Sequence, residues 1–136
     1  MPLSQDEFFN KDIKMKKFST KAVGDKGEKY AADYLKKKKY KILALNYRKR
    51  CGEIDIIAEN KQMLVFVEVK TRHNNSYLDA ALAVDRKKQI RIIKTALLYI
   101  SENKIDKFCR FDVCEVYVDP ENLKLEKINY IENAFE

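Results

Sequence analysis

The chain has 136 residues, a length that suffices for one domain with a modest core and argues against two domains. It is 46% hydrophobic and 36% charged, and its excess of lysine and arginine gives a formal net charge of +7, which favours a polyanionic partner. Three cysteines without a C-x-x-C pair argue against a disulfide framework or a zinc site, and the lack of a long apolar run or a signal peptide predicts a cytoplasmic protein without membrane contact.

The chain opens with a polar stretch that leads into a helix. Residues 1–22 are rich in lysine, and we expect a flexible basic extension there, followed by a single domain over residues 23–136. Residues 25–38 show the periodicity of a helix, and Glu28 lies on its apolar face. That apolar stripe consists of Ala31, Ala32 and Leu35. A glutamate on such a face needs a partner, since an isolated buried charge is unfavourable.

The middle of the chain predicts strands. Residues 40–48 alternate between two sets of side chains, as a strand does. Two apolar runs, 52–58 and 63–71, are separated by a short polar turn and predict a hairpin. Residues 72–84 are expected to be mostly loop, with a short helical piece at 78–83.

The last part of the chain predicts a helix and two further strands. Asp85 is a plausible N-cap for a helix that runs to about Asn103. The predicted apolar stripe of this helix is Ile90, Ile93, Leu97 and Ile100. Residues 108–118 and, more weakly, 124–131 predict strands. The order α, β, β, β, α, β with a trailing strand indicates an α/β fold in which helices flank a mixed sheet.

Three charged residues, Asp55, Glu68 and Lys70, stand inside the apolar runs of the hairpin. Glu68 and Lys70 share one face because side chains alternate along a strand. A two-residue turn within residues 60–62 places Asp55 on that face too, whereas a three-residue loop places it on the other. In the first register two carboxylates lie side by side, which is unfavourable unless a divalent cation binds between them.

The first register predicts a Mg²⁺ site, at which Lys70 positions or deprotonates a water or stabilises developing negative charge. The alternative is a solvated hairpin face with a Glu68–Lys70 ion pair. For Glu28, a role at the metal and a buried ion pair with an arginine are both open.

Other basic residues are candidates for phosphate contacts. Arg72 follows the predicted site directly, with a salt bridge as its alternative role. Lys87 lies one turn before Ile90, and its alternative is a surface lysine whose stem covers apolar surface. Arg110 and Asp112 share one strand face and form either a structural pair or a brace for Glu28.

Several segments resemble the YraN-like family of small bacterial proteins. They are Gly27-Glu28-x-x-Ala31-x-x-Tyr34-Leu35, Ile42-Leu43-x-x-Asn46-x-Arg48, residues 52–58, residues 65–72, Ala83-Val84-x-x-x-Lys87 and residues 110–113. That family resembles the PD-(D/E)xK, restriction-endonuclease-like superfamily, and within it the archaeal Holliday-junction resolvases.

The resemblance implies an αβββαβ core and makes Asp55 and Glu68 metal ligands and Lys70 the catalytic lysine. Glu28 matches the first-helix glutamate of resolvases, and Ile54 replaces the proline of the superfamily's name. The implied activity is Mg²⁺- or Mn²⁺-dependent endonucleolytic cleavage of DNA, with branched or structured DNA as a candidate substrate.

Two other functions stay open at this stage. One is a non-catalytic module that binds nucleic acid or recruits a partner, and the other is a nuclease for RNA, because no residue here is expected to read a 2′-hydroxyl. Cutting both strands of DNA would need a homodimer or sequential nicks, since one site per chain cuts one strand.

Overall fold

The computed structural model describes residues 18–73 and 84–136 and shows an α/β fold. Five strands form one mixed sheet in the order β1-β2-β3-β4-β5, in which only the β3–β4 pair is parallel. They are β1 (Lys41–Lys49), β2 (Gly52–Glu59), β3 (Met63–His73), β4 (Phe108–Val118) and β5 (Leu125–Phe135). Helix α2 (Thr20–Lys37) precedes β1, and helix α3 (Arg86–Glu102) joins β3 to β4. The predicted αβββαβ order is confirmed.

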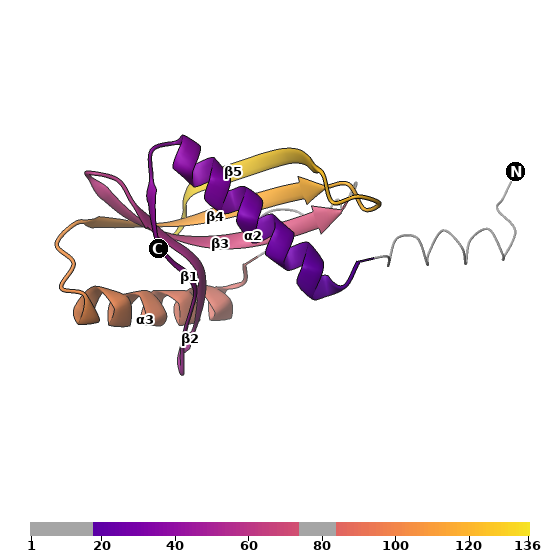
Figure 1. The fold of residues 1–136 in the computed structure, drawn as a ribbon. Helices are drawn as coiled ribbons and strands as arrows, with labels where there is room; N and C mark the ends of the chain where they lie inside the picture. The colour runs from indigo at the N-terminus through magenta and orange to yellow at the C-terminus, as the bar shows by residue number, and fades with distance from the viewer. Residues whose placement is uncertain (1–17, 74–83) are drawn as a thin grey trace, which may run out of the picture.

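The two helices cover opposite faces of the sheet (Figure 1). On the α2 face, Ala31 and Leu35 pack against the central strands; on the α3 face, Ile92 and Ala96 do so. The sheet residues of the first core include Ile56, Val65, Val67 and Val116, and those of the second include Ile57, Leu64, Phe66 and Val113. Neighbouring residues of β2 and β3 thus enter different cores, as the alternation of a strand requires.

Helix α2 begins at Thr20, ahead of the predicted start at residue 25. Ser19 is its N-cap and accepts a hydrogen bond from the Ala22 N–H at 3.0 Å. Phe18 packs against the α2 core, so the last residues of the expected 1–22 extension belong to the folded domain. The remainder of that extension and the helical piece expected at 78–83 lie outside the described residues. Neither described helix is long and apolar enough to cross a membrane.

The boundaries predicted for α3 are confirmed, but only half of its predicted apolar stripe, Ile93 and Ile100, packs against the core. Asp85 is the N-cap and Asn103 the C-cap, as the sequence indicates. The fully buried residues are Ile92, Thr95, Ala96 and Tyr99. From the predicted stripe, Ile90 and Leu97 are 40% and 59% exposed. The ring of Tyr99 packs edge-on against Phe66, and this large aromatic contact orients the helix.

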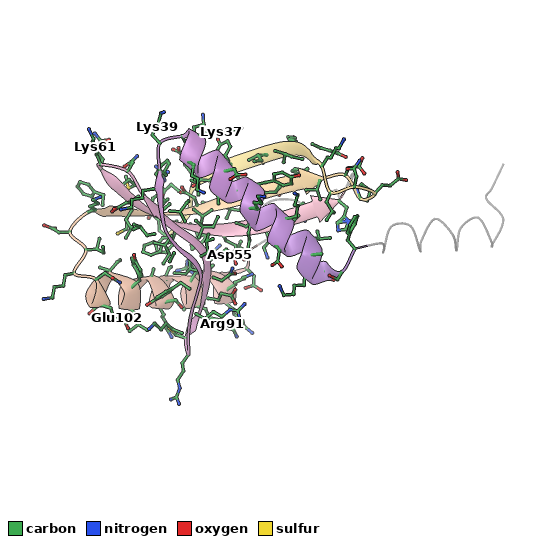
Figure 2. The ribbon with its side chains drawn as sticks, in the orientation of Figure 1. Lys37, Lys39, Asp55, Lys61, Arg91 and Glu102 are labelled. Carbon is green, nitrogen blue, oxygen red and sulfur yellow. The ribbon has the colours of Figure 1, made fainter. Side chains whose placement is uncertain are left out.

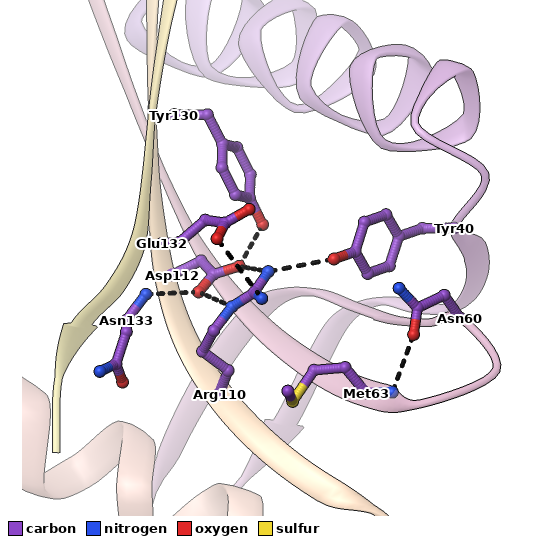
Figure 3. A network of polar contacts seen from close by, with 8 residues as sticks. All are labelled: Tyr40, Asn60, Met63, Arg110, Asp112, Tyr130, Glu132 and Asn133. Atoms are coloured by element: carbon purple, nitrogen blue, oxygen red, sulfur yellow. Dashed lines mark hydrogen bonds and ion pairs between the residues drawn. The ribbon is translucent and has the colours of Figure 1, made fainter.

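Strand β5 extends beyond the predicted residue 131 because a buried polar network holds it to β4 (Figure 3). Asp112 is fully buried and accepts two hydrogen bonds from the Arg110 guanidinium, at 2.8 and 2.9 Å. The Tyr130 hydroxyl and the Asn133 N–H also donate to it. The guanidinium in turn donates to the Tyr40 hydroxyl at 3.1 Å. Of the two roles left open for Arg110 and Asp112, a structural pair or a brace for Glu28, the structure shows the structural pair.

Candidate active site

The turn between β2 and β3 determines which charged residues meet. The Asn60 N–H donates to the Met63 carbonyl, and the Asn60 side chain accepts from the Gln62 and Met63 N–H groups. The turn is thus the two-residue form at Lys61 and Gln62, and the ladder pairs Glu59 with Leu64 and Ile56 with Val67. Continued by one residue, this register places Asp55 opposite Glu68.

Asp55 lies where the β2–β3 ladder ends. Its Oδ2 accepts a hydrogen bond from the Val69 N–H at 2.8 Å, so the carboxylate takes the place of a strand carbonyl and is held in one orientation. Burial raises the pKa of Asp55 to about 7, and the negative charge of Glu68 contributes to the rise. The ionised form of Asp55 is therefore disfavoured in the protein without a bound cation.

Glu68 is the most buried acid of the site, with 5% of its surface exposed. Its Oε1 lies 2.5 Å from Lys88 Nζ and 3.6 Å from Lys70 Nζ. This burial is inconsistent with the solvated hairpin face of the alternative interpretation, whereas the Glu68–Lys70 ion pair that the alternative included is present. The same carboxylate contacts one lysine from its own strand and one from α3.

The two lysines influence each other. Burial lowers the pKa of Lys70, and the ammonium of Lys88 lowers it further. Burial is the largest single influence on Lys88 and acts in the same direction, but the hydrogen bond to Glu68 together with the charges of Glu68 and Asp55 raises its pKa. Lys70, with 27% of its side chain exposed, is the ammonium of the pair that loses its proton more readily.

Glu28 lies on α2 and does not form a group of three metal-ligating side chains with Asp55 and Glu68 among the described residues. Its carboxylate accepts a hydrogen bond from the Asn46 side chain at 3.0 Å. Burial raises its pKa, and its charge adds to the raised pKa of Asp55. Asn46 has a φ of 51°, a left-handed conformation that asparagine tolerates well. Within the described residues Glu28 makes no ion pair with an arginine, so an asparagine replaces the arginine partner that the sequence left open.

The donor set of the described residues consists of a pair of carboxylates rather than a cluster. Among residues 18–73 and 84–136, no three His, Cys, Asp or Glu side chains lie close enough together to hold a metal ion. Asp55 and Glu68 together still suit Mg²⁺, which commonly takes one or two carboxylates and completes its shell with waters and substrate phosphate oxygens.

Comparison with known proteins identifies the family. A family model described as "Uncharacterised protein family UPF0102" matches residues 27–116. A UPF0102 protein from Caldanaerobacter subterraneus subsp. tengcongensis is 51% identical over 122 residues, which cover 89% of this chain and 100% of that protein. The chain belongs to the UPF0102 family. UPF0102 proteins from Clostridium botulinum strain 657 and Syntrophus aciditrophicus are 44% and 46% identical, over 88% and 84% of this chain and 98% and 88% of those proteins. UPF0102 is the YraN-like group that the sequence resembles.

The UPF0102 match contains Glu28, Asp55, Glu68 and Lys70. It also contains Lys88, which the sequence analysis missed: the predicted phosphate contact on α3 was Lys87, whose side chain is exposed. Lys88 lies four residues before the buried Ile92 and thus on the buried side of the helix, a side that the predicted stripe did not include.

Arg72, which was predicted to contact phosphate, forms an ion pair inside this UPF0102 protein. Its Nε lies 3.1 Å from Glu115 Oε2, and the two side chains are 10% and 1% exposed. Glu115 also accepts a hydrogen bond from the Asn129 amide at 2.8 Å. The structure thus favours the salt bridge over the phosphate contact for Arg72.

Proposed function

We propose that this UPF0102 protein is a metal-dependent endonuclease that hydrolyses phosphodiester bonds in DNA, with branched or structured DNA as a candidate substrate. The observation that carries the proposal is the buried Asp55–Glu68 pair beside Lys70 and Lys88. The negative charge of Glu68 raises the pKa of Asp55, and such a pair weakens a fold that needs it only for structure. Their presence is explained if a cation and a phosphate complete the site.

Asp55 and Glu68 would hold Mg²⁺ or Mn²⁺. When bound, such an ion supplies a water of lowered pKa and polarises the phosphodiester. The Val69 N–H fixes the direction of the Asp55 carboxylate at 2.8 Å, so that this ligand needs no reorganisation when substrate arrives. The ammonium of Lys88 forms an ion pair with the Glu68 carboxylate and balances its charge in the protein alone.

Lys70 is the residue best suited to the proton transfers or charge stabilisation of the reaction. Hydrolysis joins the oxygen of one water to phosphorus, breaks one phosphorus–oxygen ester bond and delivers a proton to the leaving oxygen. The partly exposed ammonium of Lys70 lies 3.6 Å from Glu68. In its neutral form it accepts a proton from the attacking water, and in its charged form it stabilises negative charge on the phosphate.

The test is a cleavage panel of supercoiled plasmid, linear duplex, flap, four-way junction, single-stranded DNA and RNA, each with Mg²⁺ or Mn²⁺. We expect cleavage of DNA by the wild type and at least a hundredfold loss in Lys70→Ala and Glu68→Gln. Lys61→Ala removes an exposed lysine at the β2–β3 turn and serves as the matched control. Activity that survives in Lys70→Ala and Glu68→Gln would refute the assignment. Binding without any cleavage would favour the non-catalytic module, and cleavage of RNA alone would change the substrate.

A further inference from the structure

A basic groove lies beside the proposed site. It has a volume of about 750 Å³ and is bounded by the β1–β2 turn and the N-terminal part of α3. Five basic side chains line it: Arg48, Lys49, Lys87, Lys88 and Arg91. Arg91 lies on the opposite side of the molecule from Lys37, Lys39 and Lys61 in Figure 2. The groove is therefore a place where part of the positive charge of the chain is concentrated.

Close packing between the turn and the helix forms the groove. Gly52 allows it, because a Cβ at this position would lie 2.9 Å from Thr95 Oγ1 and 3.1 Å from the Arg91 carbonyl. Cys51 Sγ lies 3.4 Å from the same threonine hydroxyl. The packed turn and helix thus fix the backbone positions of the basic residues.

The acidic residues of the groove already have partners. Glu53 pairs with Arg48 at 3.3 Å, and the Asp85 carboxylate caps α3 by accepting from the Lys88 N–H at 2.8 Å. Lys87 and Arg91, in contrast, make no ion pair within residues 18–73 and 84–136. They are four residues apart on α3 and so lie on one side of the helix, where both can face the same ligand.

Lys88 connects the groove to the proposed site. It lines the groove, and its Nζ contacts Glu68. A ligand that fills the groove therefore ends beside the carboxylate pair.

We propose that this groove binds backbone phosphates of the nucleic acid strand next to the bond that is cut, an inference that rests on the proposed function. Its described lining includes no aromatic side chain, so it offers no surface on which bases could stack. Contacts from lysine and arginine to phosphates fix the position of a strand but do not read its sequence. The groove thus provides affinity and alignment, and we expect little sequence preference from it.

The test measures binding in EDTA, so that it does not depend on cleavage. Anisotropy of a labelled DNA duplex is followed from about 50 to 250 mM KCl for the wild type and for the double variant Lys87→Ala/Arg91→Ala. Both side chains are exposed, and an unchanged melting temperature verifies the fold. We expect an affinity about tenfold lower at 0.1 M KCl and a salt slope smaller by about 1.8, since each lost phosphate contact removes about 0.9.

The matched control is Lys37→Ala/Lys61→Ala, which removes the same charge from exposed positions elsewhere. We expect it to keep an affinity within about twofold of the wild type. Equal losses in both double variants, or no loss in the groove variant, would overturn the inference. Groove-dependent binding by a wild type that cuts nothing would support the groove and refute the endonuclease. Cleavage by the wild type together with unchanged binding in the groove variant would support the endonuclease and refute the groove.

Discussion

Replacing Asp55 by asparagine should stabilise the metal-free protein at alkaline pH. In the fold, burial and Glu68 raise the pKa of Asp55 from 3.8 to about 7. The folded state therefore binds more protons than the unfolded state between these values, and the stability of the wild type falls as the pH rises through that window. Asparagine imitates the protonated acid: its oxygen can accept from Val69 N–H, and its amide can donate to Glu68.

The size of the effect follows from the same values. Each pH unit between them corresponds to about 1.4 kcal/mol, which gives an upper limit of about 4 kcal/mol at pH 8. The weaker hydrogen bond that a neutral side chain accepts from Val69 N–H offsets roughly 1 kcal/mol of this. We therefore expect a net gain of about 1–3 kcal/mol at pH 8 and a smaller gain at pH 5, because the wild type is then largely protonated at Asp55.

Urea unfolding in EDTA at pH 5 and pH 8 measures this difference. We expect the Asp55→Asn midpoint to exceed that of the wild type by about 1 M at pH 8, for a slope of about 1–3 kcal/mol/M. Glu126→Gln, at an exposed carboxylate on β5, is the control and should leave the midpoint unchanged. If Asp55→Asn is less stable than the wild type by the same amount at both pH values, then the carboxylate has a structural role and the reasoning is wrong.

Two further predictions concern the scaffold. Gly27→Ala should destabilise the protein by about 1–3 kcal/mol in urea unfolding, because a Cβ there would overlap the Thr71 side chain. A Cβ at Gly24 in the same helix meets nothing within 4 Å, so Gly24→Ala should stabilise the protein by about 0.5–1 kcal/mol. Equal effects of the two alanines would contradict this packing. Asp112→Ala removes the buried carboxylate that accepts hydrogen bonds from Arg110, Tyr130 and Asn133, and it should lower the unfolding free energy by about 3–5 kcal/mol. Glu132→Ala, at a side chain that is 66% exposed, should change it by less than about 1 kcal/mol. A small loss in Asp112→Ala would show that the network contributes little.

The elements of the fold could be predicted because their signals are local. The cap at Asp85, the alternation in β1 and the apolar runs of the hairpin each depend on neighbouring residues. The buried face of α3 could not be predicted in this way. It depends on contacts with distant residues, namely Phe66 and the close approach of the β1–β2 turn at Gly52.

The candidate site shows the same division. Asp55, Glu68 and Lys70 were recognisable because charges inside apolar runs are unfavourable without a partner. The register that brings the first two together depends on the side chain of Asn60, which stabilises a two-residue turn. Lys88 and Asn46 were missed because their partners, Glu68 and Glu28, are far away in the sequence.

The central claim, that the Asp55–Glu68 pair binds a divalent cation, is tested most directly by thermal unfolding at pH 8 with and without Mn²⁺. Binding to the folded state alone stabilises it by about 2.7 kcal/mol at a hundredfold excess over the dissociation constant. We expect Mn²⁺ to raise the melting temperature of the wild type and of Glu126→Gln, and to leave that of Asp55→Asn unchanged. An equal rise in all three proteins, or no rise in the wild type, would contradict the claim.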